Sequence, residues 1–250
     1  MNPNPAREEH LVLMLGGTGR TGGRVLKQLL DRGVRVRAIV RSAGRLPEGV
    51  AGNPLLTVTE AEPLSLSAEE MLEQVRGCDA IISCLGHTND LKGVFGAPHE
   101  LVTPMVERAC AAAVALQPTE PIRIILMSTV SVYRPGALDA RRGGVERALT
   151  GLLRALVPPA KDNQDAADFL LEYVGTDSPF VGWVVIRPDT LVDSDVTEYA
   201  LHEGIVSSLA KPDDTSRANV AHFMCDLVTE PSVWKAWRGG MPVIVNAAKA

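Results

Sequence analysis

The chain has 250 residues, of which 46% are hydrophobic and 22% are charged, and its formal net charge is −5. This composition is typical of a folded globular protein and excludes an intrinsically disordered chain. Lysine and arginine are spread along an acidic chain, and the longest apolar runs fall far short of the ~20 residues that span a bilayer, so we expect neither a nucleic-acid partner nor a membrane span.

Apolar spacing predicts an alternation of strands and helices. In chain order we expect a strand at 11–15, a helix at 22–32, strands at 34–40 and 54–58, a helix at 66–77, a strand at 79–86, a helix at 98–116, and strands at 122–128, 180–186 and 242–246. Ser67 and Glu70 form a capping box at the start of the second helix, and Gly77 ends it. Strands that alternate with helices indicate right-handed βαβ units and a parallel sheet covered on both faces.

Five glycines lie between the first strand and the first helix, in the stretch GGTGRTGG. Gly17, Gly19 and Gly22 fit the pattern G-x-G-x-x-G, in which backbone N–H groups and a helix N-terminus approach a pyrophosphate. A tight turn without a ligand usually needs only one glycine, so we favour a dinucleotide site over a merely tight turn. The residues expected to bind the cofactor here are Gly16, Gly17, Thr18, Gly19, Arg20, Thr21 and Gly22.

The end of the second strand bears on the choice of cofactor. An acidic residue there, roughly 20 positions after the glycines, would bind the ribose 2′-hydroxyl of NAD. This chain instead has Arg41, followed by Arg45, and no carboxylate at that point. Guanidinium groups suit a 2′-phosphate through charge-assisted bonds, so we expect NADP(H) to be preferred over NAD(H). The alternative is that both arginines are ordinary solvated charges.

Six stretches, taken in order, resemble the short-chain dehydrogenase/reductase superfamily: GGTGRTG, AIVRSAGR, CDAIISCLG, LMSTVSVY, VVIRPDTL and SRANVAHFM. They are most similar to the atypical branch of NmrA and the flavin/biliverdin reductases. The resemblance implies an α/β fold with a Rossmann-type, doubly wound, mostly parallel sheet of order 3-2-1-4-5-6-7. The chain has no linker that would divide it, so we expect a single domain over residues 1–250, whose C-terminal part, at about 189–246, completes the substrate pocket.

The same resemblance implies further cofactor contacts. It places Cys84, Leu85 and Gly86 beside the adenosine ribose, and Ser128 and Thr129 near the nicotinamide. It also places Arg187 and Pro188 at the nicotinamide end, where the sixth strand ends.

The usual acid–base pair of that superfamily, Tyr-x-x-x-Lys, is absent. None of the three tyrosines has a lysine four positions later, and Val157 stands four positions before Lys161. The catalytic candidates are Ser128, Tyr133 and Lys161. Each has a non-catalytic alternative. The Ser128 hydroxyl could simply bond to the backbone, Tyr133 could be a packing residue, and Lys161 could be a solvated surface lysine.

Three aspartates recur at a spacing of three residues on one predicted helix face: Asp162, Asp165 and Asp168. They could form a metal or acid–base cluster, but we favour an interaction with the dipole of their own helix. The four cysteines form no CxxC pair, so we expect reduced thiols and no metal. The first ten residues lack the apolar core of a signal peptide, and we expect a cytoplasmic protein.

Two classes of function stay open. The first is an NADP(H)-dependent oxidoreductase acting on an unidentified small molecule, with loops 87–97, 134–144 and 189–214 shaping the pocket. The second is a non-catalytic NADP(H)-binding redox sensor or regulator, which the missing Tyr–Lys pair favours. A homodimer and a regulatory protein partner both stay open.

Overall fold

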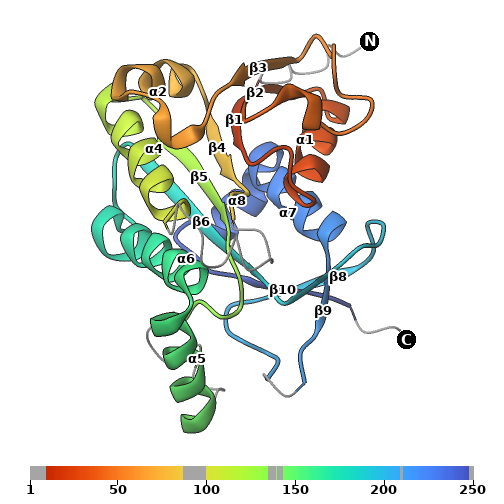
Figure 1. Cartoon of the computed structure of the whole chain (residues 1–250), viewed down its shortest axis with the longest axis vertical. Coiled ribbons are helices and arrows are strands. Elements are labelled where there is room, and N and C mark those ends of the chain that lie inside the picture. Colours follow the sequence, from red (N-terminus) through yellow and green to blue (C-terminus); the bar gives the residue numbers. More distant parts are fainter. Residues whose placement is uncertain (1–9, 87–99, 135–138, 140–142, 209–210, 248–250) are drawn as a thin grey trace.

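An eight-stranded sheet forms the centre of the computed structural model, which describes residues 10–86, 100–134, 139, 143–208 and 211–247 (Figure 1). Its strand order is β3-β2-β1-β4-β5-β6-β10-β8, and β7 pairs with β9 in a separate two-stranded sheet. The strands are β1 (Leu11–Leu15), β2 (Arg35–Val40), β3 (Leu56–Glu60), β4 (Ala80–Ser83), β5 (Ile122–Met127), β6 (Val181–Pro188), β7 (Thr190–Val192), β8 (Tyr199–His202), β9 (Asp214–Ser216) and β10 (Val243–Asn246).

Helices cover both faces of the sheet. Helices α2, α4 and α6 lie on one face, and α1 and α7 lie on the other, whereas α5 extends away from the sheet (Figure 1). The helices are α1 (Gly22–Asp31), α2 (Ala68–Val75), α4 (Val102–Leu116), α5 (Gly144–Leu156), α6 (Pro158–Asp168), α7 (Arg217–Thr229) and α8 (Pro231–Trp237), and a π-helical turn (Phe169–Val174) follows α6.

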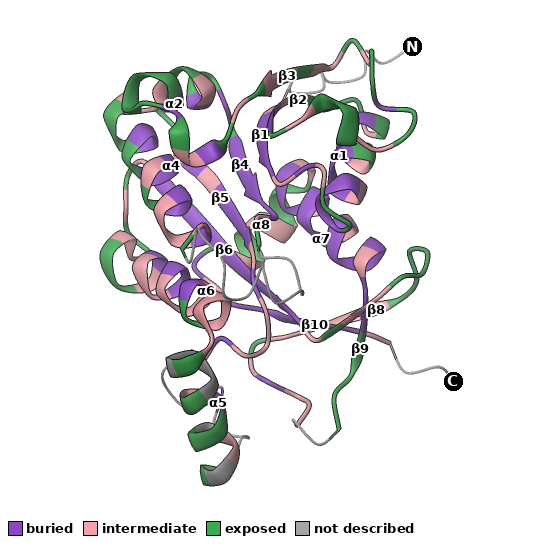
Figure 2. Cartoon of the chain, viewed as in Figure 1, coloured by how far each residue is buried: buried purple, intermediate pink, exposed green. Residues whose placement is uncertain are grey.

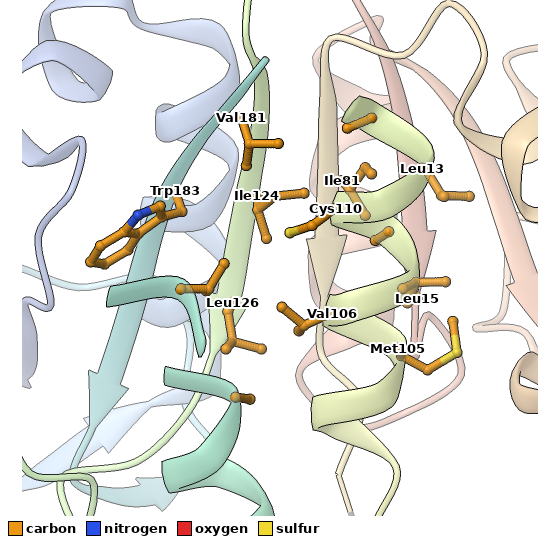
Figure 3. Close-up of a cluster of buried hydrophobic side chains, with 14 of the residues drawn as sticks. Leu13, Leu15, Ile81, Met105, Val106, Cys110, Ile124, Leu126, Val181 and Trp183 are labelled. Atoms are coloured by element: carbon orange, nitrogen blue, oxygen red, sulfur yellow. The ribbon is translucent and has the colours of Figure 1, made fainter. Parts of the chain in front are cut away.

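Side-chain alternation along the strands produces two apolar layers. On β1, Leu13 and Leu15 join the cluster beneath α4, whereas Val12 and Met14 join the cluster beneath α1 and α7. Figure 3 shows Leu13 and Leu15 in the first cluster, together with Met105 and Val106 of α4. All four residues of β4 are buried, as expected for a central strand of a parallel sheet covered on both faces (Figure 2).

The predicted Rossmann-like fold is confirmed, including the order 3-2-1-4-5-6. The seventh strand is β10, which pairs in parallel with β6. An additional strand, β8, pairs antiparallel with β10 at the sheet edge and was not predicted, because its sequence YALH lacks a clear apolar alternation. Helices α5, α7 and α8 and the short strands β7 and β9 were also not predicted.

Two local predictions, for the capping box and the cysteines, are also confirmed. Ser67 and Glu70 form a complete capping box on α2. All four cysteines are buried and unpaired. Of the helices in the described ranges, none is both long enough and apolar enough to cross a membrane.

Candidate cofactor site

The glycine-rich turn joins the carboxyl end of β1 to α1, and two of its glycines are required by packing. Gly16 has a φ of +78°, and a Cβ there would lie 2.6 Å from the carbonyl oxygen of Cys84. A Cβ on Gly22 would lie 2.2 Å from the carbonyl oxygen of Gly16. Side chains at these positions would therefore force the backbone apart.

Gly19 has a different environment. A Cβ there would meet only the carbonyl oxygen of Gly16, at 3.3 Å, and its φ lies outside the left-handed region. The N–H groups of the next three residues, Arg20, Thr21 and Gly22, have no hydrogen-bond partner among the described residues. The turn thus presents a glycine and unpaired N–H groups at the start of a helix.

This arrangement fits the pyrophosphate of a dinucleotide. The first turn of α1 contains no acidic residue, and no side chain caps its N-terminus. The free N–H groups and the helix dipole favour an anion at this point, and Gly19 allows it to approach the backbone. The residues present therefore fit the cofactor predicted from the sequence.

Three arginines next to the turn share a single carboxylate. Arg20 bonds to Asp193, which also contacts Arg24 at 3.3 Å and Arg217 at 3.0 Å. This cluster joins the turn, α1 and the start of α7 to the segment after β7. Three positive charges around one negative charge leave a positive potential beside the turn, which favours a phosphate nearby. Asp193 was not predicted, because it lies 173 positions from Arg20.

The Cys84–Gly86 segment approaches the turn through its backbone. The carbonyl of Cys84 packs against Gly16, whereas its buried thiol lies 3.7 Å from the Met224 sulfur on the opposite side, and burial raises the pKa of this thiol. Leu85 packs against the core and Gly86 is exposed. Here the chain offers backbone groups to a cofactor.

Two buried hydroxyls lie at the carboxyl edge of the sheet without a protein partner. Ser83 ends β4 and Ser128 follows β5, and neither Oγ has a hydrogen-bond partner among the described residues. Burying a hydroxyl without a hydrogen bond is unfavourable, and such exceptions are frequent at functional sites. Ser128 was predicted as a site residue, but Ser83 was missed. The adjacent Thr129 instead accepts a hydrogen bond from the N–H of Ser131 at 3.3 Å.

Arg41 and Arg45 are exposed beyond the end of β2, as expected. However, the structure corrects the expectation that no carboxylate stands there. Val40 of β2 pairs with Glu60 of β3, and the Glu60 carboxylate accepts a hydrogen bond from the N–H of Ala43 at 2.9 Å. The signal was present in the sequence, because the carboxyl ends of adjacent parallel strands lie at the same sheet edge.

The structure also corrects the expectation for Arg187. This side chain is fully buried, with an Nη1 2.7 Å from the equally buried Asp139 carboxylate. It also donates to the carbonyl groups of Met241, Val132 and Glu203. Its guanidinium holds loops together and is not available to a cofactor. The adjacent Pro188 is buried at the end of β6, where its carbonyl accepts a hydrogen bond from Val130.

Lys161 lies on the surface of α6, bonded to Asp165 and 4.0 Å from Glu100. Its hydrogen bond to Asp165 raises its pKa, which makes the ammonium a weaker acid. The structure thus matches the alternative of a solvated lysine. For Tyr133, the backbone N–H and carbonyl are both bonded to the Gln164 side chain, which fixes the segment after β5 against α6.

We expected Asp162 to interact with its own helix, α6, but it binds the N-terminus of α4. Its carboxylate accepts hydrogen bonds from the N–H groups of Leu101, Val102 and Thr103, each at 2.8 Å, at the start of α4. Burial would raise the pKa of Asp162, but these hydrogen bonds outweigh burial and lower it. The acidic group therefore caps a neighbouring helix instead of complementing the dipole of α6.

Part of the predicted substrate pocket lies outside the described residues. All of loop 87–97 is outside them, as are residues 135–138 and 140–142 of loop 134–144 and residues 209–210 of loop 189–214. Within the described ranges, no group of three or more histidine, cysteine, aspartate or glutamate side chains is arranged to hold a metal ion.

Comparison with protein families supports a nucleotide-cofactor site at the glycine-rich turn. Residues 16–231 match the model of a family described as NAD(P)H-binding. The chain belongs to the NAD(P)H-binding family. This match confirms that the chain resembles NAD(P)-binding Rossmann-type proteins, as the sequence motifs indicated. The ligand expected at the glycine-rich turn is therefore a nicotinamide cofactor.

Members of this fold have been solved from several bacteria. An oxidoreductase from Lactococcus lactis is 20% identical, with a TM-score of 0.67 and coverage of 96% of this chain and 92% of that chain. A short-chain dehydrogenase/reductase from Veillonella parvula, in complex with NADP, is 14% identical, with a TM-score of 0.66 and coverage of 96% and 95%. At these identities the structures show the shared fold alone.

One curated relative is a chloroplast protein, TIC 62 of Arabidopsis thaliana. It is 30% identical over 126 residues, which cover 44% of this chain. The match covers 20% of the length of that relative.

Proposed function

We propose that this protein is an NADP(H)-dependent oxidoreductase acting on a small molecule. The observation that carries the proposal is the glycine-rich turn, where Gly19 is open to an approaching group and three N–H groups at the start of α1 have no partner in the described ranges. The cofactor would supply the hydride chemistry, and the protein would bind and orient the reactants. The NADP complex of the Veillonella parvula protein supports the same assignment for this fold.

The remaining residues take roles along the sheet edge. Arg41 and Arg45 would bind the 2′-phosphate, because both are exposed cations next to the adenosine end of a Rossmann-type site. Ser128 and Thr129 would lie at the nicotinamide end. The buried hydroxyl of Ser128, which has no partner in the described chain, is our candidate for holding a polar atom of the substrate or moving a proton to it.

The first experiment asks whether the protein catalyses a reaction at all. Stopped-flow oxidation of NADPH is followed against a panel of quinones, flavins and carbonyl compounds. We expect turnover with at least one class of acceptor. With that acceptor, Ser128→Ala should lower kcat by about 100-fold or more if its hydroxyl transfers the proton. The matched variant Ser131→Ala removes a nearby hydroxyl and should leave kcat within a few-fold of wild type.

A second candidate function is a non-catalytic NADP(H)-binding sensor or regulator. It is favoured by Lys161, which is engaged in a surface ion pair with Asp165 instead of assisting a tyrosine. Binding of NADPH without turnover on any acceptor in the panel would support this alternative and contradict the oxidoreductase. Unchanged kcat in Ser128→Ala would leave the oxidoreductase standing but remove the role given to this serine.

The preference for NADP(H) is tested by Arg41→Ala. A hydrogen bond to a charged group contributes about 1.5–3 kcal/mol, so the variant should bind NADPH about 10- to 150-fold more weakly. NADH lacks the 2′-phosphate, so its affinity should hardly change. Calorimetric titration with both nucleotides measures the two effects, and Arg76→Ala, at the C-terminal end of α2, is the control. Equal losses for NADPH and NADH would show that Arg41 does not contact the phosphate.

A further inference from the structure

Glu60 contacts the loop after β2, which carries the two arginines of the adenosine end. It is the last residue of β3 and pairs in register with Val40, the last residue of β2. Its Oε2 accepts a hydrogen bond from the N–H of Ala43, 2.9 Å away, in the short 3-10 turn Ala43–Arg45. The carboxylate therefore binds the backbone of a residue midway in sequence between Arg41 and Arg45.

The charges of this loop are open to a ligand. Glu60, Arg41 and Arg45 are all exposed, and neither guanidinium has an ion-pair partner in the part of the chain that the structure describes. The loop thus carries two exposed cations, and the carboxylate at the end of β3 is held by a backbone N–H of this loop rather than by either arginine.

Phosphate and carboxylate would compete for this loop. A ribose 2′-phosphate is attracted by the arginines and can accept the hydrogen bond of Ala43, but Glu60 already holds that N–H group and repels a second anion. A ribose diol has the opposite chemistry, because its hydroxyls can donate hydrogen bonds to a carboxylate. The arginines and Glu60 therefore act in opposite directions on the choice between the two cofactors.

We propose that Glu60 is a specificity-determining residue that selects against a ribose 2′-phosphate. It thereby reduces the preference for NADP(H) over NAD(H) that Arg41 and Arg45 create. The proposal rests on the proposed NADP(H) function. It assigns to β3 a role that an acidic residue at the end of β2 has in NAD-binding Rossmann proteins. The expected wild type thus accepts both cofactors, with a modest preference for the phosphorylated one.

The test uses adenosine fragments, so that it does not depend on a substrate. The intact protein is titrated calorimetrically with adenosine 2′,5′-bisphosphate and with 5′-AMP. In Glu60→Gln the amide oxygen can still accept the Ala43 hydrogen bond, but the negative charge is gone. We expect the variant to bind the bisphosphate about 5- to 30-fold more tightly than wild type, and 5′-AMP with unchanged or lower affinity.

Glu62→Gln is the matched control, because Glu62 is an exposed carboxylate two residues further on whose side chain has no hydrogen bond to the loop within the described part of the chain. It should change the affinity ratio of the two fragments less than twofold. An unchanged ratio in Glu60→Gln, or an equal change in Glu62→Gln, would overturn the proposal while leaving cofactor binding intact. A wild type that binds neither fragment nor NADPH nor NADH would overturn the proposed function itself.

Discussion

A Gly19→Val variant is expected to fold normally and to lose measurable binding of NADPH and NADH. The fold should accommodate the valine with a shift of a few tenths of an ångström, because a Cβ at Gly19 makes one tight contact, 3.3 Å from the carbonyl oxygen of Gly16. It would instead occupy the space through which a pyrophosphate approaches the N–H groups of Arg20, Thr21 and Gly22. Circular dichroism and thermal unfolding measure the fold, and calorimetric titration measures binding.

Gly22→Ala provides the contrast. A Cβ at Gly22 lies 2.2 Å from the carbonyl oxygen of Gly16, so the turn itself must shift. Overpacking of this kind costs about 1–3 kcal/mol, and we expect the variant to lose both stability and binding. Normal NADPH affinity in Gly19→Val would show that the pyrophosphate does not lie against this glycine.

The second large effect is expected at the buried ion pair. Asp139→Ala should lower the free energy of unfolding by about 3–5 kcal/mol, because it leaves the guanidinium of Arg187 buried without its counter-ion. The change also removes the acceptor for the N–H groups of Arg134 and Ile205. The loops that these residues belong to would lose their common anchor near the carboxyl end of β6.

Urea denaturation of wild type and variant measures this loss. Asp177→Ala removes an exposed aspartate near the start of β6 and should change stability by less than about 0.5 kcal/mol. A loss below about 1 kcal/mol in Asp139→Ala would mean that water replaces the carboxylate, so that the pair is not the anchor we describe.

Features set by neighbouring residues could be predicted from the sequence. The glycine spacing marked the turn, because only glycine accepts the close approach of Gly22 to Gly16. The capping box of α2 uses residues three positions apart. The parallel sheet followed from the alternation of strands and helices, and its strand order followed from the family resemblance.

Features that depend on distant partners could not be predicted in the same way. Arg187 meets Asp139 across 48 positions, and Asp162 caps a helix that begins about 60 positions earlier. Arginine and aspartate look alike in a sequence whether they are solvated, paired in the core or bound to a ligand. Glu60 is an intermediate case, since strand order alone would have brought it to the end of β2.

The most direct test of the central claim is calorimetric titration of the unmodified protein with NADPH and with NADH, with thermal unfolding at saturation as a second readout. We expect one site per chain, tighter binding of NADPH, and a higher melting temperature, because ligand at ~100 times Kd adds about 2.7 kcal/mol to stability. The absence of both heat and a melting shift with either nucleotide would contradict a cofactor site at the glycine-rich turn.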